Sequence, residues 1–529
     1  MSKIIALYIN EISKMIRKAS TIVILSIIIA ACIAIPIFLK LATPLFTEFS
    51  WSNDTNLQAA KDRMDSSLLT IEKDLSALDQ SEESEMIRYE LLQNKKDMLI
   101  QLERVDLLIA AGYTNDESAD FIYDAGNMIY QFRATIRNIE SMPASERTQW
   151  EEEHLAFCRD AITFIQALPQ THDFRGYIDL LKSNLASIEK MPNGKQLVTY
   201  FEKEINSLEM IYQADPSGGT DGTYNYPAAQ NAAMLTDTWE DELDKGYTVS
   251  YSFTGEEKAD PLTPEKQEFL ENSIVVLEHR IITDSYPQGL NMTLASMGKD
   301  ASVSVGKFLA AVLIIMAAGS SIAQEIATGS IKSLIIAPVR RWKIFTAKLM
   351  ALLSILIASL LMISILSSLT VMTVFGGDAV VDYVYANNGV VGSVPYILHD
   401  ILFVFVGSVD ILVFMIFALM LSTLIRNTAS AVGLSVAIYL ITGSVSQIFM
   451  QLPFPRQLWM DFIPFLNFDL ASDVFPFVLY TLPSDYSELA LMNMNASRPG
   501  LLFSSVYLII LVFCMLLTSY DSFSRRDIK

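Results

Sequence analysis

Six long runs of apolar residues limit what this chain of 529 residues can fold into. A soluble core rarely needs several runs of about 20 residues almost free of charge, whereas a helix of that length crosses a hydrocarbon layer of about 30 Å. The runs cover residues 21–39, 308–323, 349–375, 401–425, 429–452 and 501–520. The second is long enough only with residues 303–307 leading into it. The sequence therefore predicts an all-α membrane protein with six transmembrane helices.

The distribution of lysine and arginine predicts which ends of these helices face the cytoplasm. The basic segments are residues 1–20, residues 324–348, Arg426 and the tail with Arg525, Arg526 and Lys529. The loop of residues 376–398 holds no lysine or arginine, and residues 451–500 hold only Arg456 and Arg498. Because short basic loops stay in the cytoplasm, all four basic segments fall on one side if both termini are cytoplasmic.

The formal charge of −21 is concentrated in residues 41–302, which separate the first two apolar runs. Residues 41–300 contain 46 acidic and 21 basic residues. Apolar residues recur there at three- and four-residue steps, as in residues 57–78 and 87–109, which is typical of amphipathic helices. We expect an acidic, mainly helical extracytoplasmic domain whose apolar stripes form its own core. Its acidity argues against nucleic acid as a partner.

Two further segments are predicted to lie at the membrane surface. Residues 1–20 combine an apolar stripe with lysines elsewhere on the turn, which predicts an amphipathic helix in the cytoplasmic interface before the helix of residues 21–40. Residues 451–500 are rich in proline and phenylalanine, and such apolar density is rare in a free loop. We expect short helices there that re-enter the outer leaflet or pack over the transmembrane helices.

Asp410 lies near the middle of the fourth apolar run, where an ionised carboxylate costs at least about 2.5 kcal/mol on insertion scales. It should therefore face protein or water. Two interpretations stay open. The first is a polar point on a translocation path or a subunit contact, and the second is a hydrogen-bonded contact to Tyr439, Thr442 or Ser444 of the next helix. Lys307, near the outer end of the second run, can snorkel to the surface and is the weaker indication.

No catalytic chemistry can be recognised in the sequence. The phosphate-binding GxxxxGK[ST] pattern is absent, since Gly306-Lys307 is followed by Phe308. The four histidines show no metal-ligand spacing, and no serine-nucleophile or paired-carboxylate arrangement stands out. We therefore expect a protein that is not an enzyme and binds no cofactor or metal itself. If nucleotide energy drives it, a partner must hydrolyse the nucleotide.

The connection between the second and third runs, residues 324–348, carries the most informative motif. It combines Glu325 with five lysines and arginines, and Gly329 and Pro338 are break points. Glu325 sits near the start of a short helical piece, where a carboxylate suits the helix dipole. We interpret the connection as a short cytoplasmic helix available to a soluble partner. The alternative is a basic anchor with no further role.

Topology and motif together resemble the permease subunits of ABC transporters of the ABC-2 type. The matching residues are Glu325, Thr328, Gly329, Ser330, Ile331, Leu334, Pro338, Val339, Arg340 and Arg341. They are similar to the family's Glu…Gly-Thr-Leu…Leu…Pro-Val-Ser-Arg pattern, and Ala347-Lys348 stands where the family has Gly-Lys. Ser330, Ile331 and Arg340 depart from the pattern without removing the charge or the helix breaks. The resemblance covers residues 1–39 and 303–529 and leaves out the acidic domain.

The resemblance implies a coupling helix that docks into a separate ATP-binding subunit. The residues it assigns to this interface are Glu325, Thr328, Gly329, Ile331, Leu334, Pro338, Arg340 and Arg341. ATP and Mg²⁺ would bind to the partner, and the permease would work as a homodimer or heterodimer among the lipids of a bacterial plasma membrane. The expected function is export of a hydrophobic or cationic substrate, such as a peptide, drug or lipid. A non-transporting surface protein of the same topology, such as a phage receptor or secretion-system accessory, is the alternative.

Overall fold

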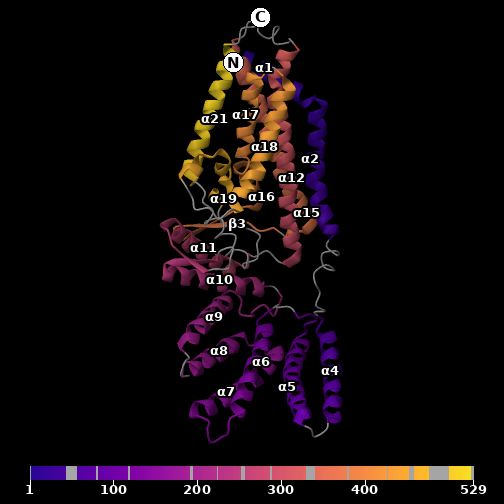
Figure 1. Ribbon diagram of the computed structural model, residues 1–529, viewed down its shortest axis with the longest axis vertical. Helices are drawn as coiled ribbons and strands as arrows, with labels where there is room; N and C mark the ends of the chain where they lie inside the picture. The colour runs from indigo at the N-terminus through magenta and orange to yellow at the C-terminus, as the bar shows by residue number, and fades with distance from the viewer. Residues whose placement is uncertain are drawn as a thin grey trace. The chain divides into compact units, whose positions relative to one another are not determined.

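The computed structural model of the chain is shown in Figure 1. It describes residues 2–42, 56–78, 82–116, 120–190, 195–222, 224–251, 257–285, 289–328, 340–377, 380–425, 427–451, 458–475 and 500–525. The chain divides into two compact units. We call Met1–Pro44, Pro287–Tyr385 and Gly392–Lys529 the membrane unit, and Leu45–Tyr286 with Ala386–Val391 the inserted domain.

Within the described residues, the membrane unit has six helical segments that are long and apolar enough to cross a membrane. They are α2 (Ala19–Leu41), α12 (Gly289–Ser321) with α13 (Ala323–Ala327), α15 (Arg341–Phe375), α16 (Tyr396–Val406) with α17 (Val409–Leu424), α18 (Thr428–Gln451) and α21 (Leu501–Ser524). The predicted all-α membrane protein with six spans is confirmed. Helix α12 is central, because it packs against α2, α15, α17 and α18. The shared core includes Ile315, Leu352 and Leu419, which are fully buried.

Helix α1 (Ser2–Ile16) precedes the first span and packs against α15. Its Met15 is buried and its Tyr8 hydroxyl lies 2.8 Å from the hydroxyl of Ser354, whereas Ile5 and Ile9 are exposed. An exposed apolar face is what a helix lying in a membrane interface needs. We call the end of the membrane unit that carries α1, α13 and the start of α15 the α1 end.

Two spans differ in extent from their predicted ranges. Helix α12 begins at Gly289, well before residue 303. The added turns can pack against the bundle because their buried Lys299 is paired with Asp400, at 3.2 Å. The fourth span is broken at Gly407-Ser408, so that the predicted run of residues 401–425 belongs to two helices, α16 and α17. Figure 1 shows α16 and α17 following one another through the bundle.

The inserted domain is mainly helical in its described residues. Its helices are α4 (Leu57–Ala77), α5 (Glu82–Ala110), α6 (Phe121–Glu140), α7 (Gln149–Thr171), α8 (Phe174–Ile188), α9 (Lys195–Ala214), α10 (Tyr226–Lys245) and α11 (Pro264–Thr283). Strand β1 (Tyr247–Tyr251) pairs with β2 (Glu257–Pro261) in an antiparallel sheet. The core is rich in aromatic rings: Phe121 stacks on Phe174 with 4.6 Å between centroids, and Tyr177 and Tyr226 are almost fully buried.

A second two-stranded sheet is formed by β3 (Tyr383–Asn387) and β4 (Val390–Val394), within the loop that was predicted only to lack basic residues. Asn388 and Gly389 connect the strands with φ angles of 49° and 75°. A two-residue type I′ turn needs this left-handed backbone at both positions, and Asn-Gly is the pair that adopts it most readily.

Short helical pieces occupy the described part of the predicted re-entrant segment, residues 451–500. They are η2 (Leu458–Phe462), η3 (Pro464–Asn467) and α19 (Leu470–Val474). Asn467 is buried, donates to the carbonyls of Asp461 and Ile463, and accepts from Ser504 of α21 at 2.8 Å. These bonds tie the segment to the sixth span. Residues 476–499 lie outside the described residues.

Candidate functional site

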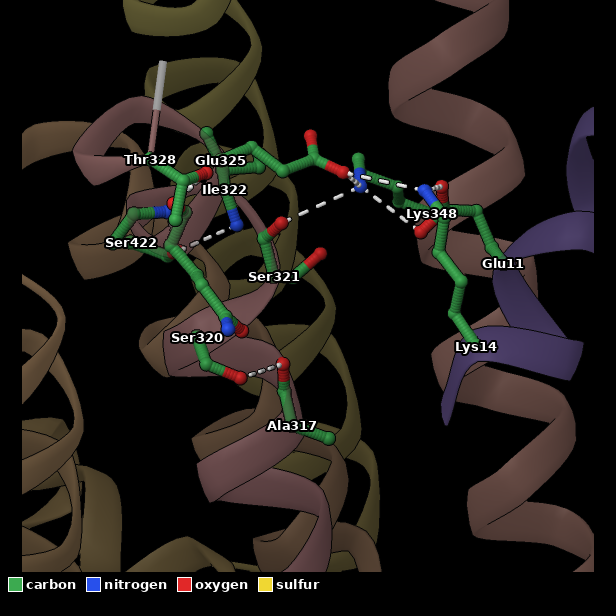
Figure 2. Close-up of polar contacts among 12 residues, drawn as sticks. Glu11, Lys14, Ala317, Ser320, Ser321, Ile322, Glu325, Thr328, Lys348 and Ser422 are labelled. Carbon is green, nitrogen blue, oxygen red and sulfur yellow. Dashed lines mark hydrogen bonds and ion pairs between the residues drawn. The ribbon is translucent and has the colours of Figure 1, made fainter. Parts of the chain in front are cut away.

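The candidate site begins at the break between α12 and α13. The backbone N–H groups of Ile322 and Ala323 donate to the hydroxyl oxygen of Ser422 in α17, at 3.0 and 2.9 Å (Figure 2). The first N–H groups of a helix have no partner inside it, so Ser422 supplies from another span the acceptor that a local cap would provide. The fourth span thereby fixes the start of the short helix that carries Glu325.

Lys348 of α15 is the centre of the site. Its side chain is only 1% exposed. The ammonium donates to Glu11 Oε2 at 2.9 Å, to Glu325 Oε1 at 2.8 Å and to the carbonyl oxygen of Ser321 at 3.4 Å. Figure 2 shows these acceptors converging on the Lys348 nitrogen. One buried ammonium therefore joins α1, α12, α13 and α15.

Lys14 completes what we call the charge cluster: Glu11, Lys14, Glu325 and Lys348. Its nitrogen lies 3.2 Å from Glu11 Oε1 and 3.7 Å from Glu325 Oε1. Two lysines face two glutamates, so the formal charge is balanced, as buried ions require. Burial opposes ionisation of Glu11, but the charges of Lys348 and Lys14 and the hydrogen bonds that they donate hold its pKa below the usual range. Glu11 is therefore ionised at neutral pH.

The predicted coupling residues have different surroundings. The Glu325 side chain is 15% exposed and lies against Lys348, so it is held within the chain instead of projecting from it. Thr328 and Arg340 are exposed. The other four predicted residues of the connection lie outside the described residues: Gly329, Ile331, Leu334 and Pro338.

Arg341 joins the third span to the sixth. Its Nη1 donates to the carbonyl oxygen of Ser524 at 2.6 Å, at the C-terminal end of α21, where a helix dipole favours a cation. One turn further along α15, the ring of Phe345 packs against Tyr520 and Phe523, at 5.7 and 6.0 Å between centroids. Arg341 thus has a partner inside this chain, as Glu325 does.

Sequence reasoning did not connect Glu11 with this site. It treated the first helix only as a basic amphipathic segment, although Glu11 interrupts its basic character. The i,i+3 spacing of Glu11 and Lys14 was a local signal. The contact with Lys348 had no signal in the pattern, because the two residues are 337 positions apart.

Asp410 lies in the first turn of α17, directly after the break at Gly407-Ser408. Lys307 of α12 donates to the carbonyl oxygen of Gly407, and its charge also acts on Asp410. The carboxylate is thus near both a helix N-terminus and a lysine. Its Oδ1 is buried and has no hydrogen-bond partner within the described part of the chain.

Of the three hydroxyls predicted as partners of Asp410, two have other partners, whereas Tyr439 lies close enough for the charge of Asp410 to act on it. Those of Thr442 and Ser444 donate to carbonyls of their own helix, at 2.7 and 3.4 Å. The ring of Tyr439 packs edge-on against Phe414, at 5.2 Å between centroids. A place for Asp410 on a translocation path or at a subunit contact stays a prediction.

A second buried ion pair joins α12 to α16. Lys299 lies 3.2 Å from Asp400, and both side chains are almost fully buried. Ser368 and Ser364 of α15 donate to Asp400 at 2.5 and 3.4 Å. The second, third and fourth spans are therefore connected here as well. No group of three or more His, Cys, Asp or Glu side chains suited to a metal ion occurs in the ranges that the structure describes.

These features define a multi-pass α-helical membrane protein whose charged connection is fastened to its spans by buried ion pairs. The model of the ABC-2 family transporter protein matches residues 5–528, and the chain belongs to this family. It is a permease subunit of an ABC transporter and partners an ABC ATP-binding subunit. The match includes the inserted domain, which the resemblance in the sequence had left out. Comparison with curated proteins and with solved structures gives no match.

Proposed function

We propose that this permease belongs to an ATP-driven exporter and that its ATP-binding partner docks at the α1 end, on the connection of residues 324–348. The observation that carries the proposal is the bridge from Lys348 to both Glu11 and Glu325. Because one ammonium holds α1, α13 and α15, a displacement of the connection reaches all three together. Rigid elements that shift as a unit are how a soluble subunit can move transmembrane helices.

The energetics of buried ions support this role. Removing one partner of a buried ion pair typically costs about 3–5 kcal/mol, because the other charge remains in a poorly solvated position. Independent movement of α13 away from Lys348 would carry a cost of that order. The hydroxyl of Ser422 adds the fourth span to the same unit, and Arg341 adds the sixth. The connection is therefore suited to transmit movement.

The proposal divides the predicted coupling residues into two roles. Thr328 and Arg340 are exposed and would contact the ATP-binding subunit. Glu325 is held by Lys348 and would transmit the movement without making the principal contact. Gly329, Ile331, Leu334 and Pro338 are assigned to the contact surface by the resemblance alone.

The remaining features follow from the same assignment. If the partner binds at the α1 end, both termini lie in the cytoplasm and the inserted domain lies outside, as the basic segments indicate. ATP and Mg²⁺ bind to the partner subunit, and two permeases, identical or different, form the membrane part. The proposed substrate is hydrophobic or cationic, and the strong acidity of the inserted domain favours a cation.

The test is purification of the tagged protein from its native host in mild detergent, with identification of the co-eluting subunit. The wild type should retain a subunit with Walker motifs, and Thr328→Trp with Arg340→Glu should release it. Arg525→Glu is the matched control, because Arg525 is exposed at the α1 end but lies outside the connection. Glu325→Gln should retain the subunit while transport is lost. A protein that is stable alone, with no such subunit, would favour the non-transporting surface protein.

A further inference from the structure

A groove of about 740 Å³ runs beside α12 at the α1 end of the membrane unit. Its walls come from the junction of α1 with α2, from α12 and α13, and from the start of α18. None of the four residues of the charge cluster lines it. Helices α12 and α18 pack closely beside the groove, because a Cβ atom on Gly319 would lie only 3.0 Å from Val432 Cγ2.

Lys18 supplies the positive charge of the groove. Its nitrogen donates to Gln324 Oε1 at 3.2 Å and to the Ser320 hydroxyl at 3.5 Å, and both acceptors are neutral. Lys14, one turn earlier, pairs with two glutamates, whereas Lys18 makes no ion pair within the described ranges. The residues that line the groove include no Asp or Glu. Glu11 and Glu325 act on Lys18 only at longer range, so an anion in the groove would meet an ammonium without a direct ion pair and neutral hydrogen-bonding groups.

The rest of the groove is apolar. Ile24, Leu313, Met316 and Val432 line it below the polar end. Ile24 follows Lys18 by six residues, which places it about 9 Å further along the helix axis at 1.5 Å per residue. The groove thus has an anion-binding group at one end and an apolar surface that extends at least about 9 Å from it. This arrangement matches the start of a phospholipid, in which a phosphate-containing headgroup is followed by an acyl chain.

A second copy of the chain fits the groove less well than a lipid. In a two-fold interface each surface meets its own copy. Two such grooves would bring the Lys18 side chains toward each other with no acid on either wall. The N-terminus of α18 adds little to anion binding, because the backbone N–H groups of Ala429 and Ser430 already donate to Asn427 Oδ1, at 2.9 and 3.4 Å.

We infer that this groove is a binding site for an anionic phospholipid, with the headgroup on Lys18, Gln324 and Ser320 and one acyl chain along Ile24, Met316 and Val432. Figure 2 shows Ser320 on α12, directly before the turn into α13. The lipid would therefore contact the same short stretch that carries Glu325. The inference is independent of the membrane orientation and of the transported substrate, so it goes beyond the proposed function.

The test measures binding of phosphatidylglycerol and of phosphatidylcholine with equal chains to the purified full-length protein, by native mass spectrometry. The wild type should prefer phosphatidylglycerol. Lys18→Gln should reduce that preference about fivefold, the factor expected for one lysine acting on an anionic lipid. Lys18→Arg should keep it. Met316→Trp, which fills the groove, should weaken binding of both lipids.

Arg17→Gln is the matched control. It removes the same charge from the neighbouring residue, whose side chain does not line the groove. It should leave the preference unchanged. Equal losses in Arg17→Gln and Lys18→Gln would show general surface attraction and overturn the inference. Wild-type affinities in Lys18→Gln and Met316→Trp would overturn it too. Cross-linking of two Met316→Cys protomers, with neither lipid bound, would show that a second copy fills the groove instead.

Discussion

The Lys348 nitrogen lies 2.8 Å from Glu325 Oε1, and this contact closes the connection between the second and third spans at its base. The two residues are 23 positions apart, on opposite sides of the segment predicted to meet the ATP-binding subunit. Because Glu11 binds the same ammonium, the closed connection is also fastened to the interfacial helix. Under the proposed function, movement of the connection would therefore reach α1 and both spans at once.

Replacing Lys348 by methionine should destabilise the membrane unit by about 3–5 kcal/mol, because Glu11 and Glu325 would lose their buried cation and keep only the more exposed Lys14. Thermal unfolding of the purified protein measures this. Lys343→Met is the control, since Lys343 is only half-buried and lies over the ring of Trp342, outside the charge cluster. The ion-pair interpretation fails if both variants unfold at the same temperature.

Ser422→Ala should loosen the start of α13. Two buried N–H groups, of Ile322 and Ala323, would lose their acceptor, at a cost of about 2 kcal/mol. Hydrogen exchange of peptides covering residues 322–327 should become faster. Ser444→Ala should leave this exchange unchanged, because its hydroxyl donates within its own helix. Unchanged exchange in Ser422→Ala would show that the cap does not hold α13.

Lys299 and Asp400 should behave as a coupled pair. Lys299→Met and Asp400→Asn each leave a buried group without its charge partner, so each should lower the free energy of unfolding. The double variant should be less destabilised than the sum of the single variants, by at least about 1 kcal/mol. Denaturant unfolding of the wild type, the two single variants and the double variant gives the double-mutant cycle. Strictly additive losses of free energy would contradict the pairing.

The stability of the inserted domain should depend on pH because of Asp124. Burial raises its pKa to about 6, even though Tyr226 and Gln230 donate hydrogen bonds to its carboxylate. The folded protein thus holds the proton more tightly than the unfolded chain. The stability that this group contributes is present below pH 4, falls as the pH rises toward 6, and stays lost above it.

Asp124→Asn should remove this loss. At pH 8 the variant should exceed the wild type in unfolding free energy by about 3 kcal/mol, and below pH 4 the difference should vanish. Thermal unfolding of both proteins across this range is the measurement. A difference that is constant with pH would show that Asp124 titrates normally in the folded protein.

The sequence was sufficient for the six spans and for a separate helix before the first of them, because these depend on length, charge and periodicity. Two further features left local signals that were not used. Asn388-Gly389 is a typical hairpin turn, and it connects β3 to β4. Gly407-Ser408 in the middle of an apolar run marks the break in the fourth span.

The buried ion pairs could not be predicted in the same way. The motif drew attention to Glu325 and Lys348 separately, and the resemblance directed Glu325 toward a partner subunit. Which lysine neutralises which glutamate is decided by how α1, α13 and α15 pack, and periodicity carries no information about that. Lys299 was assigned to the domain of residues 41–302, and its pairing with Asp400 left no signal in the pattern, because the two residues are about 100 positions apart.

The most direct test of transmission through the charge cluster is the rate of hydrogen exchange in α1. It is measured in the complex with the ATP-binding subunit, with and without ATP and vanadate. If the charge cluster transmits movement, exchange in α1 should respond to nucleotide in the wild type. The response should disappear in Glu325→Lys and in Lys348→Glu, while the subunit stays bound and hydrolyses ATP, and it should persist in Lys348→Arg, which keeps a cation beside Glu11 and Glu325. A response that persists in both single variants would contradict the account.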